Sequence, residues 1–309
     1  MAEPKQRALI TRRQVLGAGI VLALAGCARN RQTSAPSTEP SPASARPISR
    51  TEEFAALEGE YGARLGVWAL DTDGQLTIGY RDQERFAFCS TVKAFLAAAV
   101  LNQRTLPQLD EVVHYQQTDV VANSPITKEQ VATGMTWRQL CDAAVRFSDN
   151  TAANLLFSDI GGPAGAGQFI RSIGDDTTDI SRIEPELNTA IPGDVRDTTT
   201  PRAWGQNLQK TILGNVLAAD RRALLTDWMV HNTTGDKLIR SVVPEGWQVG
   251  DKTGGGDYGT RNDIAVIWPP QRGPIVLAIL TSRPQQDASL NDNDPLVAQA
   301  AKLTLDALQ

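Results

Sequence analysis

Ser90 and Lys93 stand three residues apart at the start of an apolar segment that predicts a helix. This spacing places both side chains on one face of the helix, one turn apart, so the lysine amine can reach the serine hydroxyl. The helix N-terminus also offers positive partial charge and unpaired backbone N–H groups beside Ser90, which suit an oxyanion. The pair therefore predicts a serine nucleophile with an amine as its proton partner.

Two further motifs support this interpretation. Ser-x-x-Lys alone is weak evidence for a catalytic serine, because about one match is expected by chance in a chain of this length. A capped helix would also explain it. Ser-Asp-Asn at 148–150 follows a predicted helix, and Lys-Thr-Gly at 252–254 ends a predicted strand. Each alone could be a capping serine or a strand-ending turn. In this order and context, the three motifs resemble the set of class A β-lactamases and penicillin-binding proteins.

A fourth segment lies between the second and third motifs. Residues 182–188 read R-I-E-P-E-L-N and resemble the start of the class A Ω-loop. In that family a glutamate and an asparagine four residues later, here Glu184 and Asn188, hold the hydrolytic water. Asp197 falls where the loop-closing aspartate pairs with Arg182. A polar surface loop would have to produce this pattern by accident, and the similarity spans residues 51–309, so the chain is identified as a member of the class A β-lactamases.

The resemblance implies a role for each matching residue. The implied catalytic residues are Ser90 as nucleophile, Lys93 as its proton partner, Ser148 as proton relay to the leaving nitrogen, and Glu184 with Asn188 as the deacylating pair. The implied substrate-binding residues are Asn150 at the acylamide, Asn123 at the cleft rim, Lys252, Thr253 and Arg261 at the antibiotic's carboxylate, and the neighbouring Gly254 and Gly255. Backbone N–H groups of Ser90 and Gly255 resemble the oxyanion hole.

The implied reaction explains why these residue types are needed. A hydroxyl is a poor nucleophile toward a strained cyclic amide until a neighbouring base takes its proton. Lys93 and Glu184 are both candidates for that base, and the sequence does not choose between them. Hydrolysis of the resulting ester needs a positioned water and a general base, which contributes about 10²–10⁴-fold. Glu184 is the predicted base for this second step.

The remaining sequence predicts the elements that would position these side chains. Apolar and alternating runs predict strands at 64–70, 75–80, 247–253, 262–268 and 274–281, and helices near 51–62, 219–231 and 295–308. Between 90 and 218 the signals are mostly helical. We therefore expect an α/β lobe at about 51–85 and 219–309, a helical lobe at about 86–218, and a cleft between them. The family resemblance implies an α+β fold with a mainly antiparallel five-stranded sheet flanked by helices.

The N-terminal segment predicts export. Residues 1–27 have the pattern of a signal peptide, in which Arg12-Arg13 resembles a twin-arginine signal and Leu-Ala-Gly-Cys at 24–27 resembles a lipobox. Its apolar run is shorter than the roughly 20 residues of a membrane span. Residues 28–50 are rich in Ser and Pro and predict a flexible tether. We expect an exported enzyme, in the periplasm or on the outer face of the cytoplasmic membrane, anchored by a lipid on Cys27.

Composition and charge exclude several other classes. The chain is 41% hydrophobic, enough for a sizeable core. From residue 51 onward it holds 22 Lys/Arg and 33 Asp/Glu, a formal charge of −11, with no basic stripe, so a nucleic-acid partner is not expected. Its two histidines, His114 and His231, lie far apart and outside any metal-binding or triad spacing. We expect no metal, no cofactor and a monomer that takes small-molecule β-lactams.

Some positions depart from the family pattern. At the predicted rim the chain has Asn123 where many relatives have an aromatic residue, and Gly255 where others have a hydroxyl or methyl group. Cys89 precedes the nucleophile as in disulfide-bearing carbapenemases, but the position of their second cysteine is occupied here by Gly256. Cys141 likewise has Ala97 at the position where some relatives have a second cysteine. We therefore expect two free core thiols.

Two alternative functions remain open at this stage. A penicillin-binding D,D-peptidase would share Ser90, Lys93, Ser148 and Lys252 but would lack an efficient deacylating base. A non-catalytic lipoprotein that senses β-lactams would lack an intact catalytic set. Glu184 and Asn188 argue against the first alternative, and the complete set argues against the second.

Overall fold

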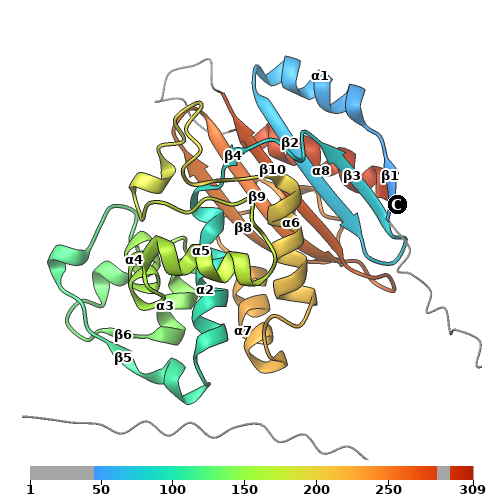
Figure 1. The fold of residues 1–309 in the computed structure, drawn as a ribbon. Coiled ribbons are helices and arrows are strands. Elements are labelled where there is room, and N and C mark those ends of the chain that lie inside the picture. The colour runs from blue at the N-terminus through green and yellow to red at the C-terminus, as the bar shows by residue number, and fades with distance from the viewer. Residues whose placement is uncertain (1–44, 284–292, 309) are drawn as a thin grey trace, which may run out of the picture. The chain divides into compact units, whose positions relative to one another are not determined.

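The structure, a computed structural model, describes residues 45–283 and 293–308 (Figure 1). The predicted signal peptide, the lipidation site Cys27 and most of the predicted tether lie outside the described residues. Among the residues that it describes, no helix has the length and apolar character needed to cross a membrane.

A six-stranded sheet forms the centre of the fold (Figure 1). Its strands, in spatial order, are β1 (Arg46–Ile48), β3 (Leu76–Tyr80), β2 (Arg64–Asp71), β10 (Ile275–Ser282), β9 (Thr260–Trp268) and β8 (Gln248–Gly256). All neighbours pair antiparallel except β1 and β3, which pair in parallel. The five predicted antiparallel strands are therefore confirmed. The short sixth strand lies at the end of the segment predicted as a tether.

Both faces of this sheet are covered by helices, because its central strands are apolar on both sides. Along β2, Trp68 and Leu70 belong to one hydrophobic core, whereas Val67 and Ala69 belong to the other. This alternation follows from the two-residue period of a strand. A strand that alternates apolar residues between two cores must be covered on both faces, and β2 lies between β3 and β10 in the sheet.

The helices divide between these two cores. Helices α1 (Thr51–Tyr61) and α8 (Asp294–Leu308) contribute to the core on one face, and α6 (Pro201–Leu208) and α7 (Ala219–Val230) to the core on the other. The helical lobe contains α2 (Val92–Gln103), α3 (Trp137–Arg146), α4 (Asn150–Asp159) and α5 (Gly162–Ser172). Helix α6 packs on β2 and β10, although sequence periodicity alone placed it in the helical lobe.

The remaining elements are short strands and single helical turns. The strands are β4 (Phe86–Ala87), β5 (Val112–Val113), β6 (Met135–Thr136) and β7 (Thr198–Thr199), with β4 paired to β7 and β5 to β6. Single helical turns lie at η1 (Cys89–Thr91), η2 (Pro107–Asp110), η3 (Gln117–Asp119), η4 (Thr127–Glu129), η5 (Glu186–Asn188), η6 (Gln209–Leu213) and η7 (Ile239–Val242). Of these, η1 and η5 carry predicted catalytic residues.

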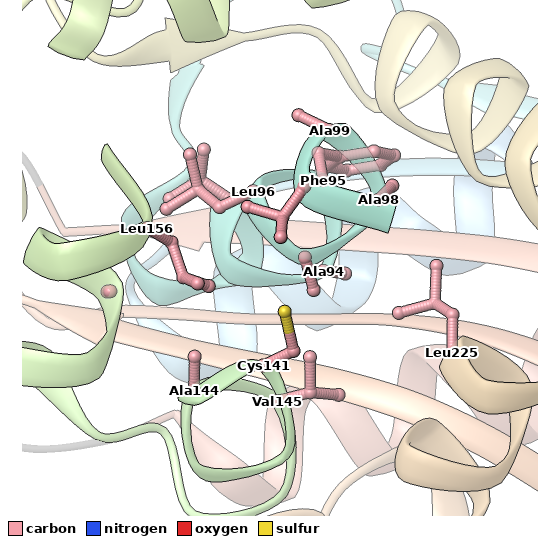
Figure 2. Packing of buried hydrophobic residues seen from close by; sticks show 14 of the residues in the cluster. Ala94, Phe95, Leu96, Ala98, Ala99, Cys141, Ala144, Val145, Leu156 and Leu225 are labelled. Carbon is pink, nitrogen blue, oxygen red and sulfur yellow. The ribbon is translucent and has the colours of Figure 1, made fainter. Parts of the chain in front are cut away.

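Helix α2 is buried on all sides, which fixes the turn η1 at its start. Every residue from Val92 to Leu101 is buried, as expected for a helix that is apolar around its whole circumference. Figure 2 shows Phe95 and Leu96 of α2 packed among Cys141, Leu156 and Leu225 from three other helices. A helix enclosed in this way cannot shift without disturbing the core, so it is a rigid support for the predicted nucleophile.

Both described cysteines are free and buried, as predicted. Burial raises the pKa of the Cys89 and Cys141 thiols. A Cβ atom built on Gly256 would lie 2.7 Å from Cys89 Sγ. Position 256 is thus adjacent to Cys89, but a Cβ there would also lie 2.5 Å from the Asn188 carbonyl oxygen, so this backbone suits glycine.

Candidate active site

A cavity of about 750 Å³ collects most of the predicted site residues. Its lining includes Ser90, Asn123, Ser148, Asn150, Asn188, Thr253, Gly254, Gly255 and Arg261. The other three predicted residues, Lys93, Glu184 and Lys252, are almost fully buried and bond to side chains of that lining. All the predicted catalytic and substrate-binding residues are therefore brought to one site, whereas Cys27 lies outside the described residues.

Ser90 lies in the turn η1, which enters α2 at Val92. The residue before it, Cys89, has a left-handed backbone with φ of 48°. The residue after it, Thr91, donates its hydroxyl to the Phe88 carbonyl at 2.6 Å and accepts from the indole of Trp204 at 2.7 Å. Ser90 is therefore held from both sides.

Lys93 Nζ has polar contacts with four residues of the site. Its Nζ donates to Ser90 Oγ at 2.9 Å, to the Ser148 carbonyl at 2.8 Å and to Asn150 Oδ1 at 2.6 Å. It also forms an ion pair with Glu184 Oε1 at 2.9 Å. Burial lowers the pKa of Lys93, and the Glu184 charge acts in the opposite direction. The lysine therefore reaches the serine hydroxyl as the i, i+3 spacing predicts.

The Ser-Asp-Asn motif forms the turn between α3 and α4. Ser148 has a left-handed φ of 54°, and Asp149 caps α4 by accepting from the backbone N–H of Ala152 at 2.9 Å. The same carboxylate accepts from Thr127 Oγ1 at 2.8 Å. These bonds fix the turn, so Ser148 Oγ lies 3.4 Å from Lys93 Nζ and 3.1 Å from Lys252 Nζ.

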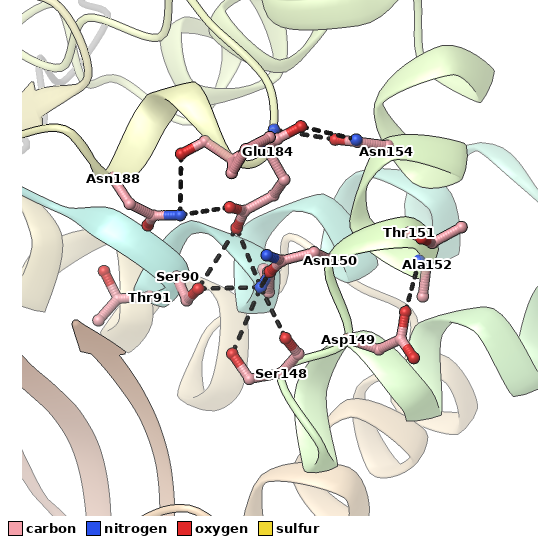
Figure 3. A network of polar contacts seen from close by, with 12 residues as sticks. Ser90, Thr91, Ser148, Asp149, Asn150, Thr151, Ala152, Asn154, Glu184 and Asn188 are labelled. Carbon is pink, nitrogen blue, oxygen red and sulfur yellow. Dashed lines mark hydrogen bonds and ion pairs between the residues drawn. The ribbon is translucent and has the colours of Figure 1, made fainter. Parts of the chain in front are cut away.

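Glu184 reaches the nucleophile from the opposite side of the site. Ser90 Oγ lies 3.3 Å from Glu184 Oε1, while Asn188 Nδ2 donates to Glu184 Oε2 (Figure 3). The backbone of Glu184 is held by Asn154, whose amide donates to the Glu184 carbonyl and accepts from its N–H, both at 2.9 Å. The predicted ion pair between Arg182 and Asp197 closes the loop.

Strand β8 forms the third wall of the site. A Cβ atom on Gly254 would lie 2.9 Å from the Phe88 carbonyl and 3.1 Å from the Thr91 nitrogen, so only glycine allows β8 to approach η1 this closely. Arg261 lies on β9 opposite Gly255 and donates to Asp294 Oδ1 at 2.6 Å. Arg261 also lines the cavity, and its ion pair with Asp294 fixes one edge of the guanidinium there.

Lys252 is fully buried on β8. It donates to the Thr253 carbonyl at 2.9 Å in addition to Ser148 Oγ. Burial, followed by the nearby charge of Lys93, lowers its pKa to about 7. The site therefore contains two buried lysines, and Ser148 contacts both.

Sequence reasoning missed several residues that complete the site. Asn154 holds the backbone of Glu184, and Asp294 orients Arg261. Thr234 lines the cavity and lies 2.6 Å from Thr253, measured between the two hydroxyl oxygens. No motif spacing links these residues to their partners, so only their placement in the fold identifies them. Within the described ranges, no cluster of three or more potential metal ligands occurs.

Comparisons with known proteins agree with this geometry. A family model described as "Beta-lactamase enzyme family" matches residues 49–308. The β-lactamase of Amycolatopsis lactamdurans is 55% identical over 270 residues, covering 87% of this chain and 89% of the relative. That of Bacillus amyloliquefaciens is 51% identical over 258 residues, covering 84% of each chain. The structure of the class A β-lactamase from Clostridium kluyveri DSM 555 has a TM-score of 0.82 and 47% identity, covering 84% of this chain and 98% of that one.

Proposed function

Because the chain belongs to the β-lactamase enzyme family, as a class A enzyme that hydrolyses β-lactams, we propose that it acts through an acyl-enzyme on Ser90. One observation carries this proposal. The buried Glu184 carboxylate contacts Ser90 and Lys93 through Oε1 and Asn188 through Oε2. It can therefore serve both the nucleophile and a water held beside Asn188.

Acylation uses the contacts around Ser90. Ser90 Oγ attacks the β-lactam carbonyl carbon, a base takes the hydroxyl proton, and the carbonyl oxygen becomes an oxyanion facing the N–H groups of Ser90 and Gly255. Lys93 at 2.9 Å and Glu184 at 3.3 Å are both placed to be that base. The amide C–N bond then breaks, and the nitrogen takes a proton through Ser148, whose hydroxyl contacts both buried lysines.

Deacylation uses the other side of Glu184. A water between Glu184 and Asn188 loses a proton to the Glu184 carboxylate and attacks the ester carbon. The ester bond to Ser90 then breaks as Glu184 returns this proton to Oγ, which lies 3.3 Å from Glu184 Oε1. The reciprocal bonds between Asn154 and the Glu184 backbone limit the movement of this carboxylate. A base held in this way needs little reorganisation during the reaction.

Substrate recognition uses the β8 wall. Lys252, Thr253 and Arg261 supply the positive charge and hydroxyl that receive the antibiotic's carboxylate, while Asn150 contacts its acylamide and Asn123 lies at the cleft rim. Asn150 Nδ2 donates to the Ala122 carbonyl at 3.0 Å, which holds the amide at the cavity wall. In a body with a formal charge of −11 from residue 51 onward, these local cations attract an anionic substrate.

The sharpest test of this mechanism replaces Glu184 with alanine. Glu184→Ala should slow deacylation by about 10²–10⁴-fold, because the general base is lost while Lys93 remains beside Ser90. After a benzylpenicillin pulse, intact-protein mass spectrometry should show one added antibiotic mass, absent when Ser90 is also alanine. Glu186→Ala, on the exposed neighbouring glutamate, is the matched control. Wild-type turnover by Glu184→Ala without a trapped adduct would contradict the assignment.

Repeated turnover distinguishes this proposal from the two alternative functions. A hydrolase turns over many equivalents of a chromogenic cephalosporin, a penicillin-binding D,D-peptidase stops after about one, and a sensor without catalysis releases no product. The contacts of Glu184 with Ser90 and Asn188 favour the first outcome.

We also propose a penicillinase spectrum with some activity on early cephalosporins and weak carbapenem turnover. The rim carries Asn123 in place of an aromatic residue, and Cys89 is free. Steady-state kinetics on the three antibiotic classes test this. A carbapenem with the highest kcat/KM would contradict it.

Export with a lipid anchor is the last part of the proposal. The twin-arginine pattern and the lipobox support cleavage before Cys27, acylation of its thiol, and placement in the periplasm or on the outer face of the cytoplasmic membrane. Cys27→Ala should release the enzyme from membranes. Recovery of the wild-type protein in the soluble fraction with an unmodified N-terminus would contradict lipidation.

A further inference from the structure

A chain of hydrogen bonds leads from a buried ion pair to the carboxylate side of the cavity. Arg240 Nε donates to Asp251 Oδ1 at 3.1 Å, and Asn232 Nδ2 donates to Asp251 Oδ2 at 2.5 Å. Thr234 Oγ1 then donates to Asn232 Oδ1 at 2.9 Å and lies 2.6 Å from Thr253 Oγ1. The chain therefore ends on a hydroxyl that lines the substrate cavity.

The buried end of this chain sets the direction of its hydrogen bonds. A carboxylate can only accept hydrogen bonds, so the amide nitrogen of Asn232 must face Asp251. The amide oxygen of Asn232, Oδ1, therefore faces Thr234. Thr234 has one hydroxyl proton, which it donates to Asn232. The proton between the two threonine oxygens must then come from Thr253. In this arrangement the Thr253 hydroxyl donates to Thr234, away from an incoming anion.

We propose that Thr234 is a positioning residue that reverses its hydroxyl so that Thr253 can donate to the substrate's carboxylate. When Thr253 donates to the anion, its oxygen needs a new donor, because two oxygens 2.6 Å apart without a proton between them repel. Thr234 supplies this proton by rotating away from Asn232. Only hydroxyl torsions change, and no covalent bond forms or breaks.

Asn232 lowers the free-energy cost of this reversal. Its Oδ1 also accepts the backbone N–H of Thr234 at 3.2 Å, so it keeps one donor after the hydroxyl leaves. In the bound state, a hydroxyl that accepts from Thr234 is a stronger donor to the charged carboxylate, because hydrogen bonds in a chain polarise one another. The neighbouring Thr233 lacks this role, since it is exposed and donates to the Arg146 carbonyl at 2.8 Å.

The inference rests on the proposed carboxylate site, and a double-mutant cycle separates the two. Benzylpenicillin kinetics would be measured for Thr234→Val, Thr253→Val and the double variant, with Thr233→Val as control and thermal unfolding to check folding.

Thr234→Val should lower kcat/KM about 3–10-fold, mainly through KM, as expected for one hydrogen bond. Thr234→Ser should keep a kcat/KM close to that of the wild type, because serine retains the hydroxyl. In the Thr253→Val background, Thr234→Val should have no further effect. Thr234→Ala replaces Thr234→Val if the valine variant does not fold.

The outcomes distinguish which idea fails. If Thr253→Val weakens benzylpenicillin binding, three results would overturn the role of Thr234 alone. These are an unchanged kcat/KM for Thr234→Val, an equal loss of kcat/KM from Thr234→Val in both backgrounds, and a kcat/KM for Thr234→Ser as low as that for Thr234→Val. Wild-type kinetics for Thr253→Val would remove Thr253 from the carboxylate site and overturn both ideas.

Discussion

Lys93 and Lys252 are both fully buried and both contact Ser148 Oγ, yet their surroundings differ. Lys93 contacts the Glu184 carboxylate at 2.9 Å and donates to three further residues. Lys252 forms no ion pair with any carboxylate of the described residues and donates only to a hydroxyl and a backbone carbonyl. We call Lys93 the balanced lysine because a carboxylate contacts its ammonium directly, and Lys252 the unbalanced lysine because none of the described carboxylates does.

This difference matches two chemical tasks. A lysine paired with a carboxylate and touching the nucleophile can pass a proton within a closed set of partners. A buried lysine without a direct counter-ion is costly by itself and gains most when an anionic substrate arrives. The balanced lysine therefore belongs to the reaction, and the unbalanced one to recognition. The following predictions test that division.

The largest expected effect comes from removing the balanced lysine. Lys93→Met should lower kcat by about 10²–10⁴-fold, because it removes a proton partner of Ser90 and leaves Glu184 buried beside an apolar side chain. Thermal unfolding should show a clear loss of stability for the same reason. Steady-state kinetics with a chromogenic cephalosporin measure the first effect. A change confined to KM would instead place Lys93 in recognition.

Removal of the unbalanced lysine should act mainly on binding. Lys252→Met should lower kcat/KM for benzylpenicillin by about 10–100-fold, the range for a hydrogen bond to a charged group, with most of the change in KM. Lys302→Met, on an exposed lysine of α8, is the control for a general loss of charge. An equal loss in kcat with an unchanged KM would contradict the division of tasks.

The pH dependence of binding should show the same distinction. Since burial and Lys93 lower the pKa of Lys252 to about 7, this lysine is charged below pH 7 and becomes neutral as pH rises above it. Affinity for an anionic β-lactam should therefore fall above pH 7, by at most about tenfold per pH unit. Lys252→Arg should remove this fall, because arginine stays charged. Persistence of the fall in Lys252→Arg would assign it to another group, such as Lys93.

The smallest effect concerns the two buried thiols, which have no reaction to serve. Burial raises the pKa of Cys89 and Cys141, and thiolates rather than thiols react with alkylating agents. In a Cys27→Ala background, native protein should therefore stay unmodified by iodoacetamide at neutral pH. After denaturation, mass spectrometry should show two additions. Rapid labelling of Cys89 in the native state would mean that the segment beside the nucleophile opens.

The amino-acid sequence alone was sufficient to predict the fold class and a set of site residues. The i, i+3 spacing of Ser90 and Lys93 and the periodic apolar runs are local patterns, and the physical rules of helices and strands convert them directly into structure. The order of the motifs then identified the family. Short edge strands carry no such pattern, which is why β1 was not predicted: it pairs with β3 through its backbone.

The contacts between side chains across the site depend instead on tertiary packing. Lys252 and Ser148 contact each other across 104 positions of sequence, and Asn154 binds the Glu184 backbone across 30. Thr234 reaches Thr253 because the segment after α7 passes β8. Such contacts depend on how elements pack rather than on the period of any one element. The difference between the two buried lysines therefore follows from packing, because the carboxylate that contacts Lys93 belongs to Glu184, which the fold brings from a distant part of the chain.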